Sequence, residues 1–197
     1  MRRLAALLLP LAATACLSRP PLVAERFAFA PPPAAAAPDP SARLVVAVPA
    51  ADVAATFDRT GLVYRTGDAT YEVDAYARLA ASPRELVAEA VRERLKASGL
   101  FRDVTRRAGS GTAVVARLEV TELYGDFRAK EPAAVLSVRA SLARAGAPPE
   151  GAVERTYVKR VPIAQRRPAD LVGGWDVALG KVAEELGADL RELLASD

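Results

Sequence analysis

Three segments in the second half of the chain have the pattern of neighbouring β-strands. Residues 113–124 and 133–145 alternate between apolar and polar side chains, so each predicts a strand with one apolar face. Residues 153–163 predict a third strand at a sheet edge, where Lys159 and Pro162 are well tolerated. The alternating apolar residues are Val114, Ala116, Leu118 and Val120, then Ala134, Leu136, Val138, Ala140 and Leu142. A meander of this kind needs cover on its apolar face, so the fold must contain a second layer.

A helix suited to this cover is predicted from Ser82. Ser82 and Glu85 have the spacing of a capping box, and Pro83 takes the first helical position. Gly99 stands where a left-handed cap would end the helix. The apolar stripe consists of Leu86, Val87, Ala90, Val91 and Leu95, and the charged residues expected on the other side are Arg84, Glu89, Arg92, Glu93 and Lys96.

A longer amphipathic helix is predicted over residues 169–194. Its apolar stripe is wide enough to cover a sheet and consists of Val172, Trp175, Leu179, Val182, Leu186, Leu190 and Leu193. Gly173, Gly180 and Gly187 recur every seven residues beside this stripe, although each interior glycine costs about 1 kcal/mol relative to alanine. Such a row would let another backbone, such as that of a second subunit, approach closely. The alternative is a solvated face that tolerates glycine.

The first 16 residues have the layout of a lipoprotein export signal. Arg2 and Arg3 precede an apolar run over residues 4–11, which is shorter than the roughly 20 residues that span a bilayer. Small residues follow at positions 13–15, and then Cys16, the only cysteine of the chain. We therefore predict cleavage after residue 15 and attachment of diacylglycerol and palmitate to Cys16.

A second interpretation of this segment is open. Ala13 and Thr14 depart from the usual Leu-Ala-Gly-Cys pattern, and Ala-Thr-Ala would suit ordinary signal peptidase, which would release a soluble secreted protein. The position of the single cysteine favours the lipoprotein. Leu17 follows it, and the resemblance to bacterial lipoproteins implies that a chain without aspartate at this position is sent to the outer membrane, on its periplasmic face.

The next segment, residues 16–41, is rich in proline and alanine and predicts a lipidated tether without a core. Within it, Phe27 and Phe29 have the spacing that places both on one face of a short strand over residues 25–29. A linker with two unrelated phenylalanines is the alternative. Residues 42–197 predict one domain, which begins with the continuously apolar residues 44–48, the pattern of a strand covered on both faces.

The composition excludes several kinds of site. Without Arg2 and Arg3 the chain has 25 basic and 24 acidic residues, interleaved, so we expect no nucleic-acid partner. The chain has no histidine and one cysteine, which excludes the usual zinc sites, Ser-His-Asp and Cys-His catalysis, and disulfides. We expect no catalytic residue, no metal and no cofactor.

Several blocks, taken in order and spacing, carry a family resemblance over nearly all of the chain after the signal. They are Phe27-Ala28-Phe29, FDRTGLVYR at residues 57–65, the capped helix, LEVTELYGDF at residues 118–127, AAVLSVRASL at residues 133–142, and the last amphipathic helix. In these blocks the chain resembles the ABC-type transport auxiliary lipoproteins. That family includes lipoproteins of paraquat-inducible operons and accessories of Mammalian Cell Entry (MCE) lipid transporters.

The resemblance implies an α+β fold, a two-layer sandwich of a mixed, mainly antiparallel sheet with two amphipathic helices on one face. The strand and helix patterns agree with it. It further implies an outer-membrane lipoprotein that catalyses no reaction and docks onto a periplasmic MCE-family protein, whose inner-membrane partner is an ABC transporter moving lipids or other hydrophobic compounds. Only Cys16 carries a role that can be assigned by position.

Two other classes of protein remain open. An outer-membrane lipoprotein of similar fold could activate a cell-wall synthase, and the neighbouring genes would separate the two roles. An enzyme is the weakest interpretation: carboxylate pairs at Glu119 and Glu122 and at Glu184 and Glu185 lie in patterned elements where solvated charges are ordinary. The segment Gly109-Ser110-Gly111 lacks the strand-turn-helix context of a nucleophile elbow.

The chain is also expected to form a homo-oligomer. Residues 44–48 require cover on two faces while two helices cover one, so a lone subunit would expose apolar sheet, and the glycine row offers a contact surface. The family resemblance implies rings, in which closed symmetry would repeat one docking surface per subunit.

Overall fold

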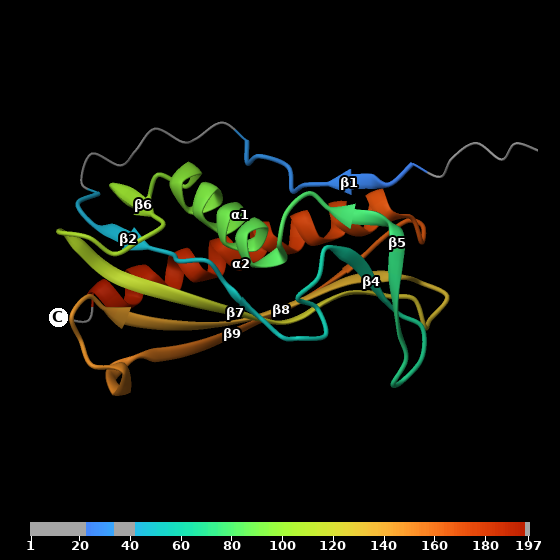
Figure 1. Cartoon of the computed structure of the whole chain (residues 1–197). Coiled ribbons are helices and arrows are strands. Elements are labelled where there is room, and N and C mark those ends of the chain that lie inside the picture. The colour runs from blue at the N-terminus through green and yellow to red at the C-terminus, as the bar shows by residue number, and fades with distance from the viewer. Residues whose placement is uncertain (1–22, 34–41, 196–197) are drawn as a thin grey trace, which may run out of the picture.

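The computed structural model describes residues 23–33 and 42–195. The predicted signal peptide, Cys16 and the rest of the predicted tether lie outside these residues. The described chain forms a mixed sheet of nine strands with two long helices on one of its faces (Figure 1). The predicted two-layer α+β fold is confirmed.

The predicted meander is the longest part of the sheet. It consists of β7 (Thr112–Asp126), β8 (Ala133–Arg144) and β9 (Val153–Pro162), joined as antiparallel neighbours. A bulge between Val120 and Glu122 shifts the register of β7. After the bulge, Gly125 faces the helices, where an added Cβ would lie 3.0 Å from Leu171. The neighbouring residue Tyr124 stacks on Phe57. Among the described strands β9 pairs only with β8, which confirms its edge position.

Six further strands, five of them with at most five residues, complete the sheet, and most of them add parallel pairings. They are β1 (Glu25–Phe27), β2 (Val45–Ala47), β3 (Asp52–Val53), β4 (Gly61–Arg65), β5 (Tyr71–Leu79) and β6 (Asp103–Thr105). β2, β3 and β4 each pair in parallel with β7, β6 pairs in parallel with β2, and β1 pairs in parallel with β5. β4 and β5 form an antiparallel hairpin. A single 3-10 turn, η1 (Pro149–Gly151), precedes β9.

The first helix, α1 (Pro83–Ala97), begins and ends close to the predicted residues. The Ser82 hydroxyl accepts a hydrogen bond from the Arg84 backbone N–H, and Gly99 adopts a left-handed φ of 69°. The Glu85 side chain forms an ion pair with Arg106, at the start of the β6–β7 connection.

Arg92 was predicted on the solvated side of α1, and this was wrong. Its side chain is buried, donates a 2.8 Å hydrogen bond from Nη1 to the carbonyl oxygen of Val48, and pairs with Glu89. The chain following β2 crosses this side of the helix, so the guanidinium loses water and is compensated by a carbonyl and a carboxylate. Sequence periodicity within α1 contains no information about that crossing.

The second helix, α2 (Pro168–Ala195), buries nearly the whole predicted stripe, and Leu193 is partly buried against it. The glycine that packing requires is Gly174, outside the predicted row: a Cβ there would lie 2.6 Å from the Ala134 Cβ and 2.7 Å from Ile163. Gly187 packs against Leu100 within the same chain. Gly173 and Gly180 face open space.

The apolar strand β2 is covered by the chain itself. Residues 45–48 are at most 8% exposed, with β2 placed between β7 and β6. Cover on both faces is therefore confirmed for residues 45–48, whereas Leu44, the first residue of the predicted strand, is 37% exposed. The inference that a lone subunit would expose this strand was wrong for residues 45–48. The short strand β6, the crossing segment after β2 and α1 provide local cover that the element count did not anticipate.

Candidate functional site

The part of the tether that the structure describes is packed against the domain. β1 adds a parallel strand beside β5, and the Phe27 carbonyl oxygen accepts a 2.7 Å hydrogen bond from the Ala80 N–H. Phe27 and Phe29 are partly buried against the core. The predicted short strand is therefore present, over Glu25–Phe27.

An ion pair between the two helices holds the residues after β1. Arg94 of α1 pairs with Asp176 of α2, and Arg94 Nη2 also lies 3.4 Å from the Ala30 carbonyl oxygen. The Ala30 N–H donates a 3.1 Å hydrogen bond to Asp176 Oδ1. The side chains of Arg94 and Asp176 are 11% and 25% exposed, so water screens this pair only partly. We call Ala30, Arg94 and Asp176 the tether clamp.

Beside the tether clamp, a groove runs between the two helices. One cleft of about 510 Å³ is lined by Pro31, Pro32, Pro33, Arg94, Ala97, Ser98, Asp176 and Gly180. A second, of about 320 Å³, shares Arg94, Ser98 and Gly180 with it and extends to Leu100, Ala183, Glu184, Ala188 and Arg191. Small side chains form much of the groove, and charged groups stand along it.

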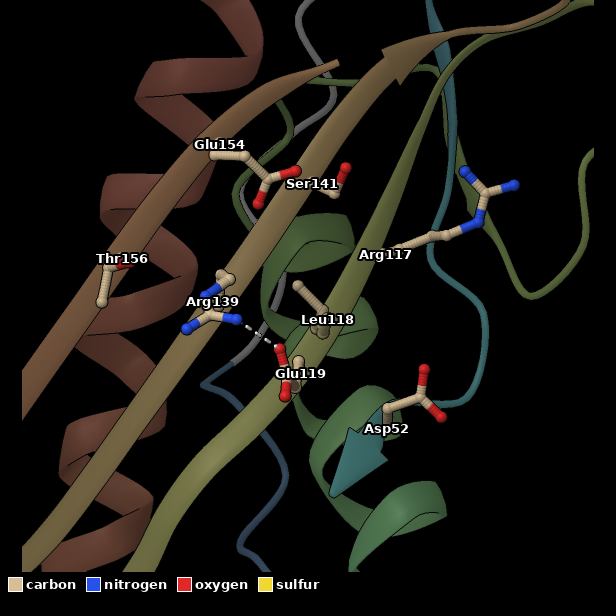
Figure 2. A pocket seen from close by; sticks show the side chains of 8 residues that line it. All are labelled: Asp52, Arg117, Leu118, Glu119, Arg139, Ser141, Glu154 and Thr156. Atoms are coloured by element: carbon tan, nitrogen blue, oxygen red, sulfur yellow. Dashed lines mark hydrogen bonds and ion pairs between the residues drawn. The ribbon is translucent and has the colours of Figure 1, made fainter. Parts of the chain in front are cut away.

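A larger cleft of about 610 Å³ lies on the helix-free face of the sheet (Figure 2). Its lining comes from β3, β7, β8 and β9 and consists of Asp52, Arg117, Leu118, Glu119, Arg139, Ser141, Glu154 and Thr156. Most of these are the outward residues of the alternating strands that the sequence predicted. We call this surface the sheet-face cleft.

The charges of the sheet-face cleft are only partly paired. Glu119 and Arg139 stand opposite each other on β7 and β8 and form a 3.0 Å ion pair. This pair contributes little stability because both side chains are exposed to solvent. In the described part of the chain, the side chains of Arg117 and Glu154 have no ion-pair partner. Both signs of charge and two hydroxyl groups are therefore available to a polar partner.

Near the β7–β8 turn a buried carboxylate organises three segments. Asp126 accepts hydrogen bonds from Arg128 and, at 2.7 Å, from Arg160, and Arg128 also pairs with Asp68 of the β4–β5 turn. The Arg128 and Arg160 guanidinium groups hold the pKa of Asp126 well below its usual range, against the opposing effect of burial. The sequence showed Asp126 only as part of LEVTELYGDF and gave no sign of its partners.

The carboxylates considered for acid–base chemistry do not converge. Glu119 pairs with Arg139 on the sheet, Glu185 pairs with Lys159 at 2.6 Å, and Glu184 lines the helix groove. Ser110 lies in the turn that precedes β7. Within residues 23–33 and 42–195, no group of three His, Cys, Asp or Glu side chains could hold a metal ion. None of the helices described there is long and apolar enough to cross a bilayer.

Taken together, a mixed sheet covered by two helices, an N-terminal segment held by its own strand, and open surface clefts define an α+β domain of two layers. A family model described as the ABC-type transport auxiliary lipoprotein component matches residues 27–187. The chain belongs to this family of transport-associated lipoproteins.

Two solved structures share the fold at low sequence identity. The protein XCC0632 from Xanthomonas campestris is 18% identical, with a TM-score of 0.68 over 82% of this chain and 92% of its own. An uncharacterised protein is 17% identical, with a TM-score of 0.67 over 87% of this chain and 99% of its own. No curated protein matches the sequence. These similarities support the fold, and the family match supports the transport association.

Proposed function

We propose that the protein is an outer-membrane lipoprotein, anchored through Cys16, that serves as an accessory subunit of an MCE-type ABC transport system. The system moves lipids or other hydrophobic compounds between the inner and outer membranes. The observation that carries the proposal is the family match over residues 27–187, preceded by a lipoprotein signal that ends at the single cysteine.

The role within that system is docking rather than catalysis or lipid carriage. The sheet-face cleft is lined by charged and hydroxyl side chains, which suit the polar surface of a protein and not a hydrocarbon chain. Arg117 and Glu154 supply charges of both signs there for a periplasmic MCE-family protein to pair with. The protein turns over no substrate.

The anchor is tested by metabolic labelling with a fatty-acid analogue. The wild-type chain should be labelled and recovered with the outer-membrane fraction, while Cys16→Ser should be unlabelled and soluble in the periplasm. Equal labelling of the two chains would refute lipidation. Labelled protein in the inner-membrane fraction would refute the outer-membrane placement alone.

The partner is tested by cross-linking in intact cells, followed by purification of the lipoprotein and identification of what is attached. An MCE-family protein is expected. Arg117→Glu should reduce its recovery at least tenfold if the sheet-face cleft is the contact, and Arg107→Glu, at an exposed position that lines neither the cleft nor the helix groove, serves as the matched control. Specific recovery of a cell-wall synthase in place of an MCE protein would favour the envelope-enzyme activator.

A homo-oligomer also belongs to this proposal. Repetition by closed symmetry would present one identical docking surface per subunit to a transport assembly. The remaining structural support is the helix groove around Gly180, since β2 and Gly187 are covered within the chain.

A further inference from the structure

Arg26 and Arg78 lie side by side on the outer strand β1 and its neighbour β5. They are directly in register, and both are exposed. Arg78 Nε donates a 3.2 Å hydrogen bond to the Ala75 carbonyl oxygen, and neither guanidinium has a carboxylate partner within the described residues. Adjacent like charges destabilise a sheet, so an anion bound between these groups would relieve the repulsion.

Apolar surface accompanies the two arginines. Tyr76, two residues before Arg78 on β5, is on the same face and 49% exposed, while the alternate residues Ala77 and Leu79 are buried. Val23, just before β1, is 78% exposed. Glu25 alternates with Arg26 and so lies on the other face of β1. We call Arg26, Tyr76 and Arg78 the β1–β5 face.

The length of the chain places this face near the predicted anchor. Val23 is seven positions after Cys16, and seven residue-to-residue steps reach at most about 25 Å when fully extended. An exposed edge with unpaired arginines and a tyrosine is therefore confined close to the membrane that holds the acyl chains. Tyrosine and arginine are both suited to the headgroup region, where one end of the side chain is apolar and the other polar.

We propose that the β1–β5 face is a second membrane contact, in which Arg26 and Arg78 bind the phosphate groups of anionic phospholipids and Tyr76 lies at headgroup depth. The inference rests on the lipid anchor of the proposed function. Acyl chains alone would let the domain swing on its tether, whereas a second contact fixes its orientation. The end of the molecule that carries β6 and the C-terminal end of α2, opposite the start of β1 in Figure 1, then points away from the membrane.

The test uses the chain from Cys16 onward with one myristoyl group coupled chemically to its only thiol. A single acyl chain binds vesicles marginally, so additional contacts change the bound fraction measurably. Binding is measured by flotation with vesicles of phosphatidylcholine alone and of equal parts phosphatidylcholine and phosphatidylglycerol. A basic residue near an anionic surface strengthens binding about fivefold. The wild-type chain should therefore bind the anionic vesicles about 25-fold more tightly than the neutral ones through these two residues.

The double variant Arg26→Gln with Arg78→Gln should lose this preference and keep its affinity for neutral vesicles. Arg102→Gln with Arg107→Gln is the matched control, since it removes the same charge from exposed arginines near β6, at the other end of the domain, and should retain the wild-type preference. Tyr76→Ser should weaken binding to both kinds of vesicle. Circular dichroism confirms that each variant is folded.

Equal losses in the two double variants, or a wild-type chain indifferent to phosphatidylglycerol, would overturn the proposal. The acyl group is attached chemically, so this result does not depend on whether cells lipidate Cys16. A failure of the membrane contact is thus distinguished from a failure of the proposed function, which the labelling experiment reports.

Discussion

The indole Nε1 of Trp175 donates a 3.0 Å hydrogen bond to the carbonyl oxygen of Val135, joining α2 to β8 inside the core. Trp175 is only 1% exposed, so its ring fills the space between helix and sheet as well as satisfying this polar contact. Trp175→Phe should lower the free energy of unfolding by about 2 kcal/mol, through lost volume and a lost donor. Val177→Ala, a half-exposed position on the same helix, should change it by less than about 0.5 kcal/mol in the same urea titration.

Leu186 tests the apolar stripe of α2 further along the helix. It is fully buried, and Leu186→Ala should cost about 2 to 5 kcal/mol because the cavity is enclosed by helix and sheet. Thermal unfolding should show a large drop in Tm. Lys181→Ala, at an exposed position one and a half turns earlier, should leave Tm nearly unchanged. Similar shifts for the two variants would contradict the packing of α2.

The sequence predicts an element correctly where the pattern of apolar residues that identifies it lies within that element alone. The alternation in β7 and β8 and the stripe of α2 each repeat one structural period over many residues, and the elements observed agree with them. The three-residue strand β1 was only one of two interpretations, because its pairing with β5 is made at a distance of about 50 residues. Short parallel strands have too few residues for a pattern of their own.

The surfaces were less predictable, because they depend on contacts between distant segments. Cys16 follows from the local signal, and the outward residues of the sheet-face cleft follow from alternation. The tether clamp joins positions 30, 94 and 176, which no local spacing relates. Arg92 shows the same limit, since a crossing segment buries it against Val48.

Asp126 should make stability depend on acid pH. Its pKa is depressed in the folded protein, chiefly by Arg128 and Arg160, so its contribution is present above the unfolded value of about 3.9 and is lost as the pH falls below it. Asp126→Asn should therefore lower the free energy of unfolding by about 2 kcal/mol at neutral pH. The gap between wild type and variant should narrow as urea titrations are repeated from about pH 5 downward.

Asp68→Asn is the control for this prediction. Asp68 pairs with the same Arg128 but its side chain is 98% exposed, so its loss should have little effect on stability at any pH. An Asp126→Asn deficit that stays constant from neutral to strongly acid pH would mean that packing of the carboxylate, and not its charge, supports the β7–β8 turn.

Gly180 offers a clean test of the proposed oligomer. Nothing lies within 4 Å of a Cβ added there, so Gly180→Leu should fold normally as a subunit while filling the helix groove. If the groove is the subunit contact, light scattering on the unlipidated chain should give a multimeric mass for wild type and a lower mass for Gly180→Leu. Lys181→Leu should keep the wild-type mass. A monomeric wild type, or equal masses for both variants, would exclude this groove as the contact.

The tether clamp predicts a local change in dynamics when it is broken. Asp176→Ala removes the acceptor for the Ala30 N–H and leaves Arg94 without its carboxylate. Since a hydrogen bond to a charged group contributes about 1.5 to 3 kcal/mol, amide hydrogen exchange at Ala30 should accelerate about tenfold or more. The measurement is exchange resolved over residues 25–33, compared with the meander of β7 to β9 as an internal reference.

Asp189→Ala provides the matched control on the same helix. Asp189 accepts a 2.6 Å hydrogen bond from the Tyr157 hydroxyl and pairs with Arg155, so its loss removes a comparable interaction between α2 and β9, far along the helix from Asp176. Exchange over residues 25–33 should be unchanged in this variant. If both substitutions accelerate exchange there equally, the tether responds to the stability of α2 as a whole. Acceleration confined to Asp176→Ala would establish that a single ion pair between the helices holds the tether where it meets the domain.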